Sequence, residues 1–444
     1  MRRALLVTPY WPPVNRVGVW RVLRTARYLK DYHWEPVICT PIPEQVYKDI
    51  PHLDAHCVAP DIEVIRPSAF VPSMAIARAL GAPKRWMSSK KRSKSLSSLH
   101  KLTELLDRGS FKIIANLLPP DQFVEWGVQA AQELKGREEL QIDVVWVTGG
   151  PFGFFVAGVL IAEALGKPLV LDYRDPWTTH REARTWWLST PQSVLRMIEG
   201  WALKRASAVG YIHREALIAN RAAFGQKSGA RWSVIRNSFD PIDLGNLAPR
   251  SLSEEYGAPA LVYAGNFYQE RSAKGILETL VELDQLDPES REYPLTLHLF
   301  GQLDPPAMSV LREHALSESR LKLYPRHSAD EIGAIMRGAE ALLLVIGEGG
   351  GHQVALSGKL WDYLAAGRPI LGLGPRVAAA KQLITDHNLG VWVDSCDREA
   401  LLSTLKQISR DGLAQPSDQD LSGFHARHMS QAVAELLDHA YETV

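Results

Sequence analysis

The sequence predicts an α/β protein made of two Rossmann-like domains. The chain has 444 residues, which suits two domains of about 100–200 residues each. Short apolar runs alternate with helical patterns along most of the chain, as in parallel sheets covered by helices. The alternation pauses at 241–255, a polar stretch with Pro, Gly and Ser, and then begins again. We therefore expect an N-terminal domain at 1–243 and a C-terminal domain at 244–424.

The first half opens with a βαβ pattern. An apolar run at 4–7 predicts a buried strand, a Pro- and Gly-containing loop follows at 8–18, and 19–29 shows one apolar helical face. The next strand is expected at 35–39. Further strands are expected at 143–147, 168–172, 208–212 and 234–236, and helices from Gly153 to Leu165 and at 193–205.

The second half repeats the pattern, with a helix at 274–286. Strands are expected at 261–264, 296–300, 322–324, 341–345, 370–373 and 391–393. The final helix, at 425–444 with its core at 425–442, is long enough to pack back on the N-terminal domain.

The composition excludes several classes of protein. Lys plus Arg and Asp plus Glu both number 50, so a nucleic-acid partner is not expected. Three cysteines, at 39, 57 and 396, show no metal-ligand or disulfide spacing and fit a reducing, cytoplasmic compartment. We expect no signal peptide, membrane span or bound metal.

The segment Ser357–Pro369 carries the clearest functional pattern. Ser357 suits a helix N-cap, and Gly367 suits the position after the helix C-terminus. Lys359 and Asp362 are three residues apart, so they share a helix face. The glycines just before the helix, including Gly350 and Gly351, could offer backbone amides to a phosphate. Asp362 could then accept ribose hydroxyls.

A second pattern follows the first strand of the C-terminal half. Gly265 and Asn266 end the strand, and Arg271 and Lys274 stand at the start of the next helix. A glycine allows close approach of the backbone, and two cations would stabilise a diphosphate. The alternative is a pair of solvated cations at a helix start.

Charged residues also end the strand at 168–172. Asp172, Arg174 and Asp175 stand at its carboxyl end, the edge where open α/β sheets bind ligands. They could contact the donor sugar or the acceptor, with Asp172 or Asp175 as a base. A structural Asp–Arg pair that holds the loop is the alternative. Gly18 ends the loop on the same edge and could bring backbone close to a sugar or phosphate.

These segments resemble the motifs of GT-B glycosyltransferases, specifically the family-4-like (group-1 type) enzymes that build surface polysaccharides and glycolipids. The stretch Asp362-Tyr363-Leu364-Ala365-Ala366-Gly367-Arg368-Pro369 is similar to the E-Y-L-A-x-G-x-P stretch of that family. The family has a second acid eight positions earlier, where this chain has Val354. Sugar recognition must therefore be built differently here.

Three other segments share the resemblance. The D-x-R-D-P-W string at 172–177 occurs in the same transferases. The loop at 8–18 is similar to the family's P-P-x-x-G-x-G loop, with Arg16 where a small residue is common. The segment Asn237–Asp240 resembles the N-G-x-D hinge, with Ser238 in place of glycine.

The resemblance implies a GT-B fold, in which two Rossmann-like domains face each other across a cleft. The N-terminal domain would bind the acceptor and the C-terminal domain the nucleotide. The implied enzyme (EC 2.4 class) is retaining and metal-independent, and it moves a sugar from a UDP- or GDP-linked donor without a further cofactor. The acceptor would be a saccharide, a lipid-linked molecule or a small molecule. Arg271, Lys274, Lys359 and the amides near Gly350 and Gly351 would stabilise the departing diphosphate.

Three alternatives remain open at this point. A nucleotide-sugar epimerase could share the fold, and the missing acid at Val354 would fit a non-catalytic scaffold. The hypothesis of a dinucleotide-dependent oxidoreductase is weakened because no G-x-G-x-x-G follows the first strand.

The segment Lys84–Lys94 holds six basic residues beside Trp86. It is either a solvated loop or a peripheral contact with anionic lipid on the inner face of a membrane.

Overall fold

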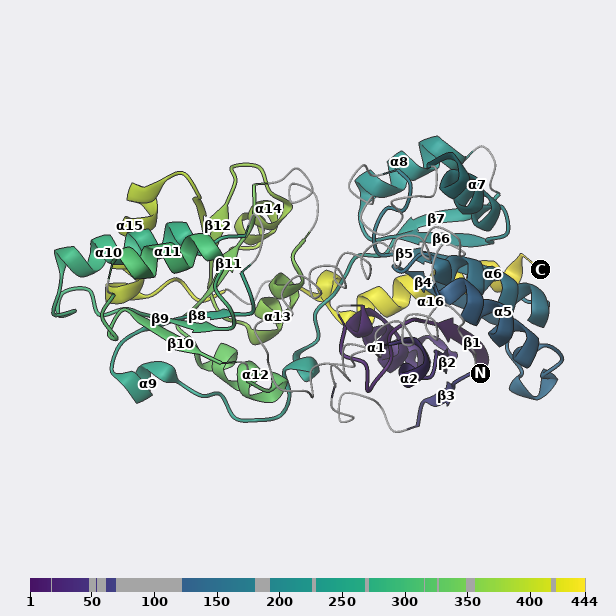
Figure 1. Ribbon diagram of the computed structural model, residues 1–444. Helices are drawn as coiled ribbons and strands as arrows, with labels where there is room; N and C mark the ends of the chain where they lie inside the picture. The colour runs from purple at the N-terminus through teal and green to yellow at the C-terminus, as the bar shows by residue number, and fades with distance from the viewer. Residues whose placement is uncertain are drawn as a thin grey trace, which may run out of the picture. The chain divides into compact units, whose positions relative to one another are not determined.

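The chain divides into two compact units, each a parallel sheet flanked by helices (Figure 1). The N-terminal unit comprises Met1–Asn237 and Ala426–Val444, and the C-terminal unit comprises Ser238–His425. This confirms the predicted α/β class with two Rossmann-like domains. The computed structural model describes residues 1–16, 18–47, 53, 61–68, 122–179, 192–225, 229–267, 271–314, 316–325, 327–348, 356–416 and 421–443.

The N-terminal unit contains a parallel sheet of seven described strands in the order β3-β2-β1-β4-β5-β6-β7. The strand order reverses between β1 and β4, which creates the switch point where such sheets bind ligands. The strands are β1 (Arg2–Val7), β2 (Trp34–Cys39), β3 (Glu63–Ile65), β4 (Val144–Gly149), β5 (Leu169–Tyr173), β6 (Ala208–Tyr211) and β7 (Arg231–Val234).

Helices cover both faces of this sheet because its strands are apolar on both sides. In β1, Leu5 and Val7 face one core and Ala4 and Leu6 face the other, as the two-residue period requires. The first core is covered by α5 (Gln122–Leu134), α6 (Gly153–Leu165), α7 (Gln192–Leu203) and α8 (Arg214–Phe224). The second is covered by α1 (Val19–Tyr28) and α16 (Ala426–Glu442). Short α2 (Pro43–Val46), η1 (Leu29–Tyr32) and η3 (Glu138–Leu140) complete the unit.

The final helix, α16, returns to the N-terminal unit and lies against α1 and strands β4 to β7. Its apolar stripe, which includes Val433 and Leu437, joins the second core. Polar bonds fix its position, because Trp34 Nε1 donates to Asp438 Oδ1 at 3.0 Å. The helix therefore closes the face of the sheet that α1 covers only in part.

The C-terminal unit has six described strands in the order β10-β9-β8-β11-β12-β13, all parallel. They are β8 (Ala260–Ala264), β9 (Thr296–Phe300), β10 (Leu321–Tyr324), β11 (Ala341–Val345), β12 (Ile370–Gly374) and β13 (Gly390–Asp394). One face packs on α10 (Lys274–Leu286), α11 (Pro305–Glu313) and α15 (Arg398–Asp411). The other packs on α9 (Leu252–Tyr256), α12 (Ala329–Gly338), α13 (Gly358–Ala366) and α14 (Ala379–Asp386). Two short 3-10 helices are η6 (Pro241–Leu244) and η8 (Ser422–Phe424).

Most predicted elements occur within one or two residues of their expected positions, but two segments differ. The strand expected at 234–236 lies at Arg231–Val234, because the carbonyl groups of Ile235 and Arg236 accept hydrogen bonds from Arg21 instead. The polar stretch at 241–255 is not a bare linker. It contains η6 and α9 and packs on α12, where Arg337 Nη1 donates to Leu244 O at 3.0 Å.

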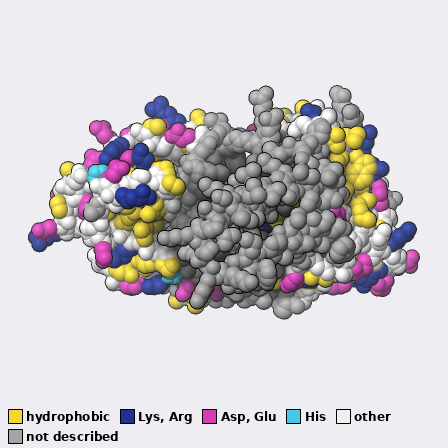
Figure 2. All heavy atoms as spheres, in the orientation of Figure 1, with side chains coloured by type: hydrophobic (Ala, Val, Ile, Leu, Met, Phe, Trp, Pro, Cys, Tyr) yellow, Lys and Arg dark blue, Asp and Glu magenta, His cyan; other side chains and the backbone are white. Residues whose placement is uncertain are grey.

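Basic and acidic side chains are interspersed over the described surface in the view of Figure 2, in keeping with the zero net charge. Among the described helices, none combines the length and the hydropathy needed to cross a bilayer.

Candidate functional site

Helix α13 is framed as the sequence predicted. Gly367 ends it in the left-handed conformation at φ 64°, and its N–H bonds the carbonyl groups of Tyr363 and Leu364. Ser357 is the N-cap residue, but its side chain makes no capping hydrogen bond. The amides of the first turn are therefore not occupied by that hydroxyl, and the positive end of the helix dipole lies at Lys359.

Lys359 and Gly265 are in direct proximity, although they are far apart in sequence. Gly265 follows β8 with φ of 126°, and a Cβ at this position would overlap the ammonium nitrogen of Lys359. The same nitrogen lies 4.9 Å from the centroid of the Tyr263 ring. Glycine is thus needed here both for its backbone conformation and for the space that the ammonium occupies.

Two other predicted residues influence Lys359 electrostatically. Burial lowers the pKa of Lys359 to about 8; the carboxylate of Asp362 raises this pKa, and the guanidinium of Arg271 lowers it further. A buried ammonium beside a second cation is stabilised by an anion that contacts both. Gly265, Arg271, Lys359 and Asp362 therefore form one cluster, which we call the cation cluster.

Lys274 lies outside this cluster. It is the first residue of α10, its side chain is 55% exposed, and its Nζ pairs with Glu278 Oε1 at 3.6 Å along the helix. The sequence analysis predicts that Lys274 and Arg271 bind the diphosphate together. In the structure, Lys274 instead pairs with Glu278, one turn along the same helix. Of the predicted cations, the structure thus brings together Arg271 and Lys359.

The loops around the cation cluster are held by polar bonds. Asn266 Oδ1 accepts from Gln302 N at 3.0 Å, which ties the loop after β8 to the loop after β9. Asp304 accepts from Ser272 Oγ at 2.6 Å and from Ala273 N at 3.0 Å, next to Arg271. The sequence analysis predicts that Asn266 contacts the nucleotide. In the structure, its side-chain oxygen accepts the hydrogen bond from Gln302 N.

Tyr363 is a positioning residue, a role that the sequence analysis does not assign to it. Its hydroxyl donates to Leu343 O in β11 at 2.9 Å and accepts from Ala264 N at 3.5 Å, next to Gly265. The ring is buried, and it fixes α13 against β8 and β11. The sequence feature that could have indicated this role is the position of Tyr363 directly after Asp362 in the Asp362–Pro369 motif. Gly350, Gly351 and Val354 lie outside the described residues, as do Lys84–Lys94.

In the N-terminal unit, the side chain of Arg174 lies at the carboxyl end of β5, the edge of the sheet where ligand binding is predicted. Its Nε donates to Gly149 O at 2.9 Å, and Nη2 donates to Gly150 O. The guanidinium lies 5.6 Å from the Tyr10 ring centroid, and a Cβ on Gly18 would overlap it. Burial lowers the pKa of Arg174. Gly18 therefore gives space to Arg174, and these two predicted residues are neighbours.

Asp172 has a structural environment that differs from its predicted contact with substrate. Both carboxylate oxygens accept from Arg21, at 2.7 Å from Nε and 2.6 Å from Nη2, and both side chains are almost fully buried. Arg21 also donates to Ile235 O at 2.9 Å and to Asn237 Oδ1 at 3.0 Å. A carboxylate held in this way does not face solvent, so Asp172 is better placed to hold the loop than to act as a base.

Asp175 is the exposed carboxylate of the same segment. The chain beyond it is fixed, because the buried Glu199 accepts from Thr178 N at 3.1 Å and from Asn220 Nδ2 at 2.8 Å. Burial raises the pKa of Glu199. With Asp172 bound by Arg21 and Thr178 bound by Glu199, the loop presents Asp175 to solvent.

Arg21 and Glu199 were not predicted. Both belong to helices and are almost fully buried, at 4% and 0% exposure. The sequence feature that could have indicated them is a charged residue within an apolar helical pattern. Such a residue is buried only when its charge is paired or hydrogen-bonded. Their partners are distant in sequence, so the pairing itself could not be read from the pattern.

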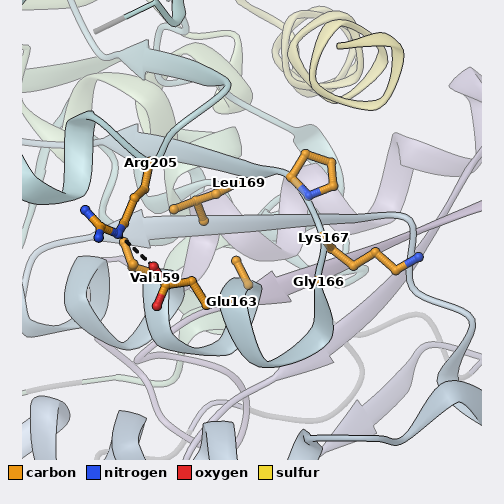
Figure 3. A pocket seen from close by; sticks show the side chains of 8 residues that line it. Val159, Glu163, Gly166, Lys167, Leu169 and Arg205 are labelled. Atoms are coloured by element: carbon orange, nitrogen blue, oxygen red, sulfur yellow. Dashed lines mark hydrogen bonds and ion pairs between the residues drawn. The ribbon is translucent and has the colours of Figure 1, made fainter. Parts of the chain in front are cut away.

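A surface pocket of about 260 Å³ lies at the other edge of the N-terminal sheet, between the end of α6 and the start of β5. It is lined by Val159, Ala162, Glu163, Gly166, Lys167, Pro168, Leu169 and Arg205. Figure 3 shows Arg205 turned toward Glu163, and their ion pair measures 2.7 Å. Because ligands bind at the carboxyl ends of parallel strands, this pocket is not the predicted site. In the described part of the chain, no group of three His, Cys, Asp or Glu side chains is arranged to hold a metal.

No known protein family matched the sequence, and no curated protein matched it. Solved structures do resemble it. Sucrose-phosphate synthase from Thermosynechococcus elongatus is 12% identical with a TM-score of 0.53, covering 99% of this chain and 95% of that chain. HepE from Anabaena, solved in complex with UDP and glucose, is 16% identical with a TM-score of 0.53, covering 99% of this chain and 100% of that chain.

A UDP-forming α,α-trehalose-phosphate synthase from Burkholderia xenovorans is 13% identical with a TM-score of 0.53, covering all of this chain and 98% of that one. At identities this low, the likeness is one of fold. The three structures are GT-B proteins, and their similarity extends over both units. The chain therefore has the GT-B fold, an α/β fold of two Rossmann-like domains.

Proposed function

We propose that this protein is a glycosyltransferase that moves a sugar from a nucleotide-diphosphate sugar to an acceptor hydroxyl. The observation that carries the proposal is the cation cluster, in which the Lys359 ammonium occupies the space beside Gly265, close to Arg271 and next to the first turn of α13. This arrangement supports binding of a diphosphate, since cations and helix amides both bind phosphate oxygens.

The cation cluster gives each residue a role. Arg271 and Lys359 bind the diphosphate and stabilise the negative charge that develops when it departs. Asp362, one helix turn from Lys359, accepts hydrogen bonds from the ribose hydroxyls. The exposed Lys274, paired with Glu278, contributes less. The backbone near Gly350 and Gly351 adds amide donors in this proposal.

The N-terminal unit supplies the acceptor side. Asp175 is the exposed carboxylate at the carboxyl end of β5 and is our candidate for the group that accepts the proton of the acceptor hydroxyl. Arg174 lies beside it and holds the turn at Gly149 and Gly150. In the reaction, the acceptor oxygen bonds to the anomeric carbon while the bond to the diphosphate oxygen breaks. The diphosphate takes the electron pair.

The fold supports the same reaction class, since HepE, with this fold, was solved with UDP and glucose. We propose a UDP- or GDP-linked donor, transfer with retention and charge stabilisation by side-chain cations instead of a metal. The acceptor is a saccharide, a lipid-linked molecule or a small molecule of polysaccharide or glycoconjugate biosynthesis in the cytoplasm.

The test is incubation of the full chain with UDP-, GDP-, ADP- and dTDP-sugars and a panel of acceptors, followed by mass spectrometry. A glycosylated acceptor together with an equal amount of released nucleoside diphosphate supports the proposal. A changed sugar that stays on its nucleotide would indicate an epimerase. If no donor is consumed and no nucleoside diphosphate raises the melting temperature, the chain is a scaffold and the proposal is wrong.

A further inference from the structure

The segment from α7 to β7 has a charge balance unlike that of the whole chain. Six basic residues lie among the described residues from Gln192 to Val234, and all are exposed. The same range has two acids, of which Glu199 is buried and Glu215 is exposed. The chain as a whole has equal numbers of basic and acidic residues. The basic residues are Arg196 in α7, Lys204 and Arg205 directly after α7, Arg214 and Arg221 in α8, and Arg231 in β7; of these, Arg205 pairs with Glu163 of α6.

The two helices form one surface. They cover the same face of the sheet, since both contribute to the first core of the N-terminal unit, and they are neighbours in Figure 1. Asn220 of α8 donates to Glu199 of α7 at 2.8 Å. The guanidinium of Arg196 lies 5.6 Å from the ring centroid of Phe224, which again joins α7 to α8. Their inward sides are thus locked together, and their polar sides face solvent.

Large apolar side chains project from this basic surface. Met197 in α7 is 67% exposed and Ile218 in α8 is 55% exposed. Val194 is 36% exposed one helical turn before Met197. A single exposed apolar residue is ordinary. Apolar side chains within an excess of basic ones are the features that bind an anionic lipid surface, through electrostatic attraction and shallow insertion.

We propose that the α7–α8 surface, defined by Arg196, Met197, Lys204, Arg214, Ile218 and Arg221, docks on an anionic lipid bilayer. Two observations select this partner over a protein groove or a nucleic acid. The surface is formed by the outward sides of two helices and not by a groove, and its exposed Met197 and Ile218 suit insertion into lipid better than contact with nucleic-acid phosphates. The surface also adjoins the ligand edge, because Gln192 Nε2 at the start of α7 donates to Thr178 O at 2.8 Å.

The experiment measures co-sedimentation of the full chain with vesicles. Vesicles of phosphatidylcholine alone are compared with vesicles that contain about 30% phosphatidylglycerol, at low and high salt. The expected result is binding to the anionic vesicles at low salt and release at high salt. A Lys204→Gln/Arg214→Gln/Arg221→Gln variant should lower the partition coefficient at least about tenfold, since each basic residue near such a surface contributes measurably. A Met197→Gln/Ile218→Gln variant should lower it several-fold at low salt, where the wild-type chain binds.

A matched control neutralises three exposed arginines of the C-terminal unit, with Arg291→Gln, Arg312→Gln and Arg398→Gln, and should change the partition coefficient less than twofold. Melting temperatures show that each variant is folded. Equal binding to both vesicle types, or full binding by the α7–α8 charge variant, would overturn the proposal. The same applies if binding is lost only when Lys90, Lys91 and Arg92 are neutralised. Because the readout needs no sugar donor, its outcome is independent of the proposed transferase activity.

Discussion

The ammonium of Lys359 occupies the place that any side chain at position 265 would fill. Lys359 lies in α13, and Gly265 follows β8. The contact therefore joins two segments for which the sequence analysis predicts nucleotide binding independently. Burial in this position lowers the pKa of Lys359 to about 8. In the proposed function, a bound diphosphate would offset the cost of holding the ammonium there.

The first prediction concerns Gly265→Ala. The new Cβ would overlap Lys359, and a backbone φ of 126° is strained for alanine, so we expect at least a tenfold loss of nucleoside diphosphate affinity. The free energy of unfolding should fall by about 1–3 kcal/mol. Gly275→Ala is the control, because a Cβ there meets no atom within 4 Å and the residue is helical. Affinity that is unchanged in Gly265→Ala would contradict the assigned contact.

The second prediction is a pH dependence of nucleotide binding. The pKa of free Lys359 is about 8, and a bound diphosphate would raise it, so binding above pH 8 takes up a proton. The Kd for UDP should therefore be nearly constant from pH 7 to 8 and then rise up to about tenfold per pH unit. Calorimetric titrations from pH 7 to 9.5 measure this, because the phosphate, with a second pKa of about 6, no longer titrates there.

The control for this pH profile is Lys359→Met, which removes the titrating group. Its weaker affinity should be independent of pH over the same range. An identical rise of Kd in the variant would assign the proton to another group.

The third prediction tests the Arg21–Asp172 pair. Asp172→Asn leaves the guanidinium of Arg21 buried without its counter-charge, so the free energy of unfolding should fall by about 3–5 kcal/mol. Chemical denaturation measures the change. The control is Glu163→Gln, which breaks the half-exposed pair with Arg205 and should cost less than about 1 kcal/mol. Equal effects of the two substitutions would show that the buried pair is not a structural anchor.

The fourth prediction concerns Asp175. If this carboxylate accepts the acceptor's proton, Asp175→Asn should lower kcat by about 100-fold or more, with little change in the donor KM. Glu139→Gln is the control, because this exposed carboxylate lies just before β4 at the other edge of the sheet. A normal kcat in Asp175→Asn would remove Asp175 from the mechanism.

The sequence was informative wherever a local pattern decides the structure. The helix at 274–286 and the strands at 296–300 and 341–345 match their predicted bounds, because apolar period and flanking turn residues are local features. Gly367 ends α13 as predicted, for the same reason. Arg271 also acts electrostatically on Lys359, in keeping with the common carboxyl edge of the strands that precede the two residues.

What the sequence could not supply are contacts between distant segments. The partner of Asp172 is Arg21, 151 residues away, and not the adjacent Arg174. The i+4 pairing of Lys274 with Glu278 competes with its predicted role. The hydrogen bonds of Tyr363 to Leu343 and Ala264 depend on how α13 packs on the sheet. Each of these is decided by tertiary packing, which residue spacing does not encode.

The cation cluster as a diphosphate site is the central claim, and calorimetric titration with UDP and GDP tests it most directly. We expect one of the two nucleotides to bind the wild-type chain, with affinity lowered at least tenfold in Lys359→Met and changed less than about threefold in Lys274→Met, which removes an exposed charge. Equal affinity in wild type and Lys359→Met, or a larger loss in Lys274→Met, would contradict the account.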